Sequence, residues 1–156
     1  MIILSVAIPL ITACKQEPVI NFSEDSVDNI YLTCKERGKE YWRNVIIDQI
    51  NKSIKSEKYF IASNNNKLYQ YGKIASLSDY GEYYSWSEPE DRMYYSFELD
   101  RTSLKMRVNS WLIENLSYEY FNCTKHLDYS HFKDKEKNII DELTKEAKRK
   151  EEAKKI

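Results

Sequence analysis

Residues 93–109 read MYYSFELDRTSLKMRVN, and this stretch carries the clearest structural signal in the chain. Apolar and polar side chains alternate on both sides of the central DRTS, which is the period of a β-strand with one buried face. Residues 100–103 have the composition of a turn, so the stretch predicts an antiparallel hairpin. The expected inward face of this hairpin consists of Met93, Tyr95, Phe97, Leu99, Leu104, Met106 and Val108.

Further strand patterns lie on both sides of this hairpin. Ile30, Leu32 and Cys34 alternate with less apolar neighbours, and residues 68–77, 82–86 and 110–123 also favour strands. Together they predict a mainly β domain over residues 29–124, an antiparallel meander or small barrel of about seven or eight strands.

Residues 43–58 have two interpretations. A hairpin turning at Asn51-Lys52 fits the β-favouring composition of this segment. A spacing of four between apolar residues fits the face of a helix instead. We favour the hairpin. The residues that would form the helix face are Trp42, Ile46, Ile50 and Ile54.

The chain changes character near its C-terminus. Residues 133–156 hold nine basic and seven acidic residues, with no glycine or proline, and predict a charged C-terminal helix. A thin apolar stripe suggests that only the first turns of the helix pack against the domain. The remainder is either a solvated tail or a surface for a partner helix. The stripe consists of Ile139, Ile140, Leu143 and Ala147.

Composition argues against several functions. The 24 basic and 25 acidic residues balance without a basic stripe, so no nucleic acid partner is expected, and with three glycines in the chain no phosphate-binding loop is expected. His126 and His131 are expected on the surface. Glu88, Glu90 and Asp91 are expected on an exposed, solvated loop. We therefore predict a non-catalytic protein, not an enzyme, with no cofactor and no metal.

Aromatic residues are frequent, and thirteen of them are tyrosines. Because neighbouring residues of a strand point to opposite faces, Tyr83 and Tyr84 cannot both be buried by one core. Tyrosine and tryptophan are enriched at binding surfaces, although tyrosine also occurs on the solvent face of ordinary sheets. We predict a binding surface for a protein partner, formed by Tyr80, Tyr83, Tyr84, Trp86 and Tyr94.

The N-terminus begins with an apolar segment, residues 1–13, that is too short to span a bilayer, which needs roughly 20 residues. It ends in Ile11-Thr12-Ala13-Cys14, which resembles the lipobox of bacterial lipoprotein signal peptides. The resemblance implies cleavage before Cys14, acylation (palmitate) of this residue, a membrane anchor in the cell envelope, and a tether over residues 14–28. By the same resemblance, Lys15 after the cysteine implies the outer membrane, facing the periplasm, if the source has two membranes. The alternative is an ordinary signal peptide or a buried strand.

With Cys14 assigned to lipid, two cysteines remain, Cys34 and Cys123. An envelope compartment is oxidising, so this pair predicts a disulfide bond that ties the first strand to the last and closes the meander. A metal site is the alternative, because Cys123 and His126 have the spacing of two zinc ligands, but Cys34 has no second ligand near it.

The opening strand Tyr31-Leu32-Thr33-Cys34, combined with a late cysteine, also resembles the periplasmic C-type lysozyme inhibitor lipoproteins. These are small antiparallel barrels. We expect a lipid-anchored envelope protein that acts as a binding module for another macromolecule. The alternatives are an inhibitor of a lysozyme-type hydrolase, which the resemblance implies, or a phage- or plasmid-borne exclusion lipoprotein that blocks a surface receptor.

Overall fold

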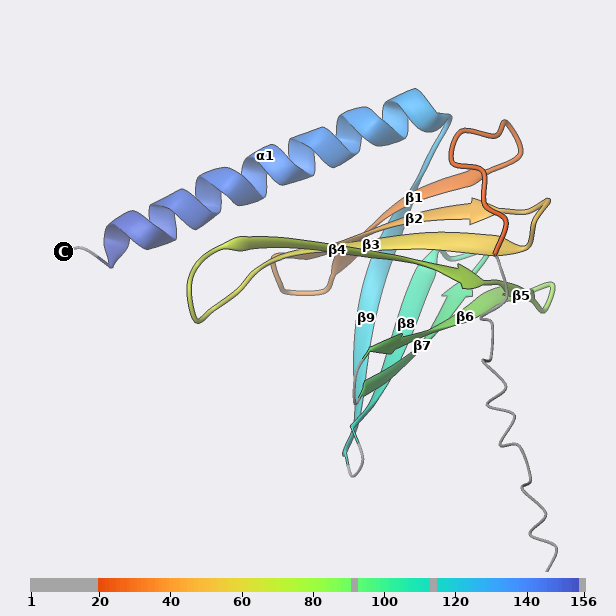
Figure 1. Cartoon of the computed structure of the whole chain (residues 1–156), viewed down its shortest axis with the longest axis horizontal. Helices are drawn as coiled ribbons and strands as arrows, with labels where there is room; N and C mark the ends of the chain where they lie inside the picture. The colour runs from red at the N-terminus through yellow and green to blue at the C-terminus, as the bar shows by residue number, and fades with distance from the viewer. Residues whose placement is uncertain (1–19, 91–92, 113–114, 155–156) are drawn as a thin grey trace, which may run out of the picture.

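The structure is a computed structural model that describes residues 20–90, 93–112 and 115–154. Its described residues form nine strands followed by one helix (Figure 1). The elements are β1 Ile30–Glu36, β2 Tyr41–Asp48, β3 Ser53–Ile61, β4 Leu68–Ser76, β5 Ser78–Asp79, β6 Tyr83–Glu90, β7 Met93–Asp100, β8 Lys105–Leu112, β9 Asn115–His126 and α1 Tyr129–Ala153.

All strand pairs are antiparallel, and the sheet order is β4-β3-β2-β1-β9-β8-β7-β6-β5. The first strand therefore pairs with the last, and the sheet curls into a nearly closed barrel (Figure 1). The gap lies between β4 and β6, where the Lys73 ammonium donates a hydrogen bond to the Pro89 carbonyl. The predicted mainly β fold, an antiparallel meander closing into a small barrel with a C-terminal helix, is confirmed.

The hairpin predicted over residues 93–109 is present as β7 and β8. Asp100 holds the turn, because its Oδ1 accepts hydrogen bonds from the backbone N–H groups of Thr102 and Ser103. Leu104 has a positive φ of 53° where the chain enters the second strand. On the predicted inward face Phe97, Leu99, Met106 and Val108 are fully buried, whereas Met93, Tyr95 and Leu104 are partly buried.

The ambiguous segment also forms a hairpin, so the helical alternative for residues 43–58 is wrong. Asp48 accepts a hydrogen bond from the backbone of Asn51, and Lys52 adopts the left-handed conformation that the tight turn requires. Strand β6 runs beyond the predicted 82–86 to Glu90, so Glu88 lies in a strand and not on an exposed loop.

The sheet has two packed faces, not one. The barrel interior holds Leu32 and Cys34 of β1, while Tyr31 and Thr33 of the same strand are buried on the outside. Figure 1 shows the reason, because α1 lies across the outer side of β1–β3. Simple alternation cannot reveal that a helix covers the second face, so the sequence predicted one buried face for this strand.

Helix α1 begins at Tyr129, four residues before the predicted start, because Asp128 caps it by accepting a hydrogen bond from the backbone of His131. Its buried stripe includes the predicted Ile139 and Leu143. Two further residues on this stripe, Phe132 and Glu136, were not predicted. No helix in the described part of the chain is long and apolar enough to cross a bilayer.

Cys34 and Cys123 are direct partners in the register of β1 and β9, and their sulfur atoms lie 2.11 Å apart, a disulfide distance. The pair ties the first strand to the last, as predicted. Residues 20–28 of the expected tether lie against the sheet: Asp48 accepts from the Ser23 backbone, and the Ser53 hydroxyl donates to the Asn21 carbonyl. Cys14 lies outside the described residues.

Candidate functional site

The predicted aromatic surface divides into separate groups in the structure. Tyr84 and Trp86 point into the barrel core and are 3% and 2% exposed, so they take no part in an outer surface. Tyr80 and Tyr83 are exposed and stack on each other, with ring centroids 4.9 Å apart. Tyr94 is exposed at the opposite end of the β6–β7 pair, opposite Pro89, and is therefore remote from them.

Tyr94 belongs instead to a larger group that the sequence analysis missed. We define the aromatic face as the outward side chains Tyr94 of β7, Trp111 of β8, and Leu116, Tyr118 and Tyr120 of β9. All five are between 44% and 58% exposed. They adjoin across the sheet, because Tyr94 pairs with Trp111 and Trp111 pairs with Leu116. The rings of Tyr94 and Trp111 stack 5.5 Å apart.

The aromatic face results from an inverted pattern in β9. Residues 116–121 read LSYEYF, which on its own suggests Leu and Tyr inside and Ser and Glu outside. The structure has the opposite arrangement. Phe121 and Cys123 point into the barrel, where Cys123 is held against Cys34, and this fixes the phase of the whole strand. The strand therefore exposes Leu116, Tyr118 and Tyr120, and it turns Glu119 toward the barrel interior.

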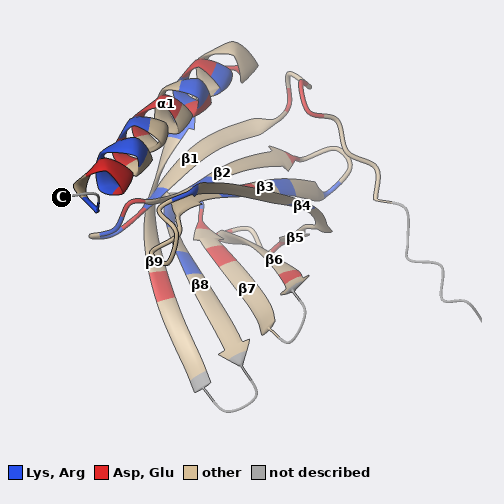
Figure 2. Cartoon of the chain, turned by 60° about the vertical axis from the view of Figure 1, so that its left-hand side comes forward, with Lys and Arg blue, Asp and Glu red and all other residues tan. Residues whose placement is uncertain are grey.

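Few charges accompany the aromatic face. Glu98 and Arg107 form an ion pair on its margin, with 2.5 Å between Oε2 and Nη2, so their charges cancel locally. Asn109 lies on the same outer side between Ser96 and Tyr118, and its buried Oδ1 has no hydrogen-bond partner within the described structure. In Figure 2 charged residues are densest along α1, which lies on the other side of the molecule.

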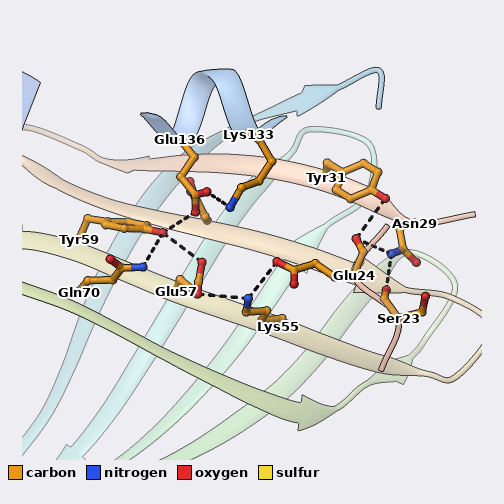
Figure 3. A network of polar contacts seen from close by, with 11 residues as sticks. Ser23, Glu24, Asn29, Tyr31, Lys55, Glu57, Tyr59, Gln70, Lys133 and Glu136 are labelled. Atoms are coloured by element: carbon orange, nitrogen blue, oxygen red, sulfur yellow. Dashed lines mark hydrogen bonds and ion pairs between the residues drawn. The ribbon is translucent and has the colours of Figure 1, made fainter. Parts of the chain in front are cut away.

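The outer side of β1–β3 is built differently, because α1 covers it and a polar network fastens the helix (Figure 3). The Glu136 carboxylate accepts hydrogen bonds from the Tyr59 hydroxyl at 2.6 Å and the Asn44 amide at 3.2 Å, and it pairs with Lys133. Burial alone would raise the pKa of Glu136, but the bonds from Lys133, Tyr59 and Asn44 outweigh it and lower that pKa. The pKa of the Tyr59 hydroxyl is raised, mainly by burial and secondly by its hydrogen bond to Glu136.

A second buried polar group lies inside the barrel. Arg43 Nη1 is 3.1 Å from Glu88 Oε2 and 2.6 Å from the Ser56 hydroxyl, and both charged residues are almost fully buried. The Trp86 indole also donates to Glu88, at 3.1 Å. Burial alone would lower the pKa of Arg43, but Tyr41 and Glu88 raise it, so the guanidinium stays charged. A buried pair of this kind is weak evidence for stability, because desolvation offsets its attraction.

The barrel is open at the end where β1 turns into β2. A cavity of about 550 Å³ lies there, and we call it the mouth. Its walls are aromatic and charged rather than aliphatic, whereas the opposite half of the barrel is filled by apolar side chains. The mouth is lined by Glu36, Lys39, Glu40, Tyr41, Lys58, Phe60, Ile61, Tyr95, Glu119 and Lys150.

The histidines do not form a site together. His126 is half-buried beside the Thr33 hydroxyl, 3.0 Å from its Nε2, and burial lowers its pKa. His131 is exposed at the start of α1 and contacts Asp128. Because Cys123 is paired with Cys34, the alternative of zinc binding by Cys123 and His126 is wrong. The described residues contain no group of three or more His, Cys, Asp or Glu placed to hold a metal ion.

No protein-family model matches the chain, and neither the curated proteins nor the solved structures give a significant match. The residues of this chain therefore carry the functional proposal by themselves.

Proposed function

We propose that this chain is a lipid-anchored envelope protein that binds another protein through its aromatic face and catalyses no reaction. One observation carries the proposal: four aromatic rings and a leucine lie together, half-exposed, on a sheet face that no other element of the described chain covers. Exposed apolar groups are costly in water, and monomers rarely keep them in contiguous patches without a partner.

The composition of the aromatic face supports a protein as the partner. Tyrosine and tryptophan provide rigid contact area with a polar tip, and they are over-represented among the residues that contribute most to protein–protein binding. The margin adds the neutralised pair Glu98–Arg107, which resembles the polar rim of such interfaces. A nucleic acid partner would require a basic surface, but the basic residues beside Tyr120, which are Arg37, Lys105 and Arg107, lie among the acidic residues Glu98 and Asp100.

The anchor rests on the lipobox-like sequence before Cys14. The chain from Cys14 to Ile20 spans six peptide steps, or at most about 20 Å. Ile20 lies beside Ile74 and Tyr80, at the end of the barrel where β4 meets β5. An acylated Cys14 would therefore hold this end close to the bilayer and leave the aromatic face free along the side of the barrel. The replacement Cys14→Ser should move the protein out of the membrane fraction.

Site-specific photo-crosslinking in the source cell tests the partner. A photoreactive residue in place of Tyr118, in the middle of the aromatic face, should give one discrete crosslinked band. The matched control replaces Lys145 on the exposed side of α1 and should give none. A captured hydrolase would indicate an inhibitor, and a captured outer-membrane channel would indicate receptor exclusion. Equal crosslinking from both positions, or none from Tyr118, would contradict the proposal.

A variant separates binding from folding. With the photoreactive residue kept at position 118, Trp111→Ser combined with Tyr94→Ser should abolish the captured complex, while the far-ultraviolet circular dichroism and the Cys34–Cys123 pairing remain those of the parent protein. A double variant that folds normally and still yields the complex would place the interface elsewhere.

A further inference from the structure

The mouth of the barrel is independent of the aromatic face, since it opens inside the sheet and not on its outer side. We infer that the mouth binds an organic ammonium ion, a protonated amine carried on a small apolar or aromatic body, with Glu119 as its counter-ion and Tyr41, Phe60 and Tyr95 as its walls. The cavity of about 550 Å³ lies within the usual size range of small-molecule sites.

The inward surface at this end is not what a purely structural barrel needs. Buried apolar side chains, aliphatic and aromatic, fill most of the other half, but here the strands turn tyrosines, lysines and glutamates toward an open cavity. Two of the rings that line the mouth touch, because the centroid of Tyr41 is 5.9 Å from that of Phe60, and Phe60 also stacks on Tyr69, beyond the lining, at 5.6 Å. Aromatic faces attract cations through their quadrupole. Lys58 already uses this property, because its Nζ lies 4.9 Å from the ring centre of Tyr71 and 5.5 Å from that of Tyr95.

The charges of the mouth leave one acid for a ligand. Glu36 pairs with Lys39, Glu40 pairs with Lys35, and Lys150 pairs with Glu146 on the helix. Lys58 is also engaged in interactions of its own, among them its contacts with the rings of Tyr71 and Tyr95. Within the described part of the chain, the half-buried Glu119 makes no ion pair, although it lines the same cavity. A partly desolvated carboxylate beside aromatic rings is the arrangement that recognises an ammonium group.

The surroundings of Glu119 add a dependence on pH. Burial and the neighbouring Glu36 of β1 raise the pKa of Glu119, while Lys39 of the β1–β2 turn, Arg43 of β2 and Lys58 of β3 oppose this increase without cancelling it. Glu119 therefore becomes neutral at a higher pH than an ordinary glutamate. A ligand held by its charge should be released as the pH falls through this raised pKa.

Calorimetric titration of the full chain with phenethylamine as the probe tests the inference. Phenylacetate, which has a similar body and the opposite charge, is the comparison ligand. We expect saturable binding of phenethylamine only. Glu119→Gln should weaken it about tenfold or more, the value of a hydrogen bond to a charged group. Phe60→Leu, which conserves bulk but removes a ring, should weaken it about two- to fivefold.

The control Glu82→Gln makes the same change of charge in the turn before β6 and should leave binding unaltered. Affinity in the parent protein should fall in acid, and this dependence should be absent in Glu119→Gln. Tighter binding of phenylacetate, unchanged binding in Glu119→Gln, or the absence of saturable binding at millimolar probe would each overturn the inference. Circular dichroism of each variant excludes loss of the fold as the cause.

Discussion

The two outer faces of this sheet carry similar residues and treat them in opposite ways. On the side of β1–β3, Tyr31, Ile46 and Tyr59 are at most 3% exposed because α1 lies over them. On the side of β7–β9, Trp111 and Tyr118 are half-exposed. The covered face shows how this fold buries tyrosines when it needs them for stability. Because no helix of the described residues covers the second face, its half-exposed rings should contribute less to folding than the buried ones.

The largest expected change in stability comes from removing the disulfide bond between β1, whose outer face α1 covers, and β9, which carries part of the aromatic face. Cys34→Ser with Cys123→Ser should lower the free energy of unfolding by up to about 4.5 kcal/mol, the chain-entropy value for a loop of this length. Urea unfolding measures it. Reductant should destabilise the parent protein and leave the variant unchanged. An equal response of both to reductant would show that this pair does not hold β1 and β9 together.

The same substitution on each face compares them directly. Leu143→Ala removes a side chain buried between α1 and the sheet and should cost about 3 kcal/mol. Leu116→Ala removes the same atoms from the aromatic face, where the expected cost is within about 0.5 kcal/mol. Thermal and urea denaturation of the two variants check this difference. Similar losses of stability would mean that the aromatic face is covered in the folded protein.

A pair of hydroxyl deletions sharpens the comparison. Tyr59→Phe removes a hydrogen bond to the buried Glu136 carboxylate and should destabilise the protein by about 2 kcal/mol. Tyr118→Phe, on the exposed face, should change stability by less than about 0.5 kcal/mol. Urea midpoints measured in one buffer are sufficient. A larger effect at Tyr118 than at Tyr59 would contradict the assignment of the two faces.

The smallest expected effect is the pH dependence of the unfolding free energy that Glu136 contributes under α1. The folded protein lowers the pKa of Glu136 below its unfolded value of roughly 4.3. The resulting stabilisation is complete above the unfolded-state pKa and is lost as the pH falls through the folded-state pKa. Unfolding free energies measured between neutral and acidic pH should therefore decline less in Glu136→Gln than in the parent protein. Parallel pH profiles would rule out this contribution.

Local patterns predicted much of the fold and little of the site. Alternation and turn residues determine the hairpin of residues 93–109 and the turn at Asn51, because the interactions that form them are close in sequence. The outward orientation of the Tyr118 side chain could not be predicted from β9 alone. It depends on the pairing of Cys123 with Cys34, which lies 89 positions away in the sequence. The burial of Glu88 could not be predicted from β6 either, because it depends on an ion pair with Arg43 of β2. In each case the deciding partner lies on a distant strand.

The pairing of β1 with β9 also sets the order of events during synthesis. Apart from β1 and the two-residue β5, each strand can pair with a predecessor as it emerges, but β1 finds its second neighbour only when residues 121–126 are available. Until then β1 presents one open edge, and open edges invite pairing with other chains. Closure across such a sequence distance is slow. A chain that ends before residues 121–126 would keep this edge open and should therefore aggregate more readily than the full chain.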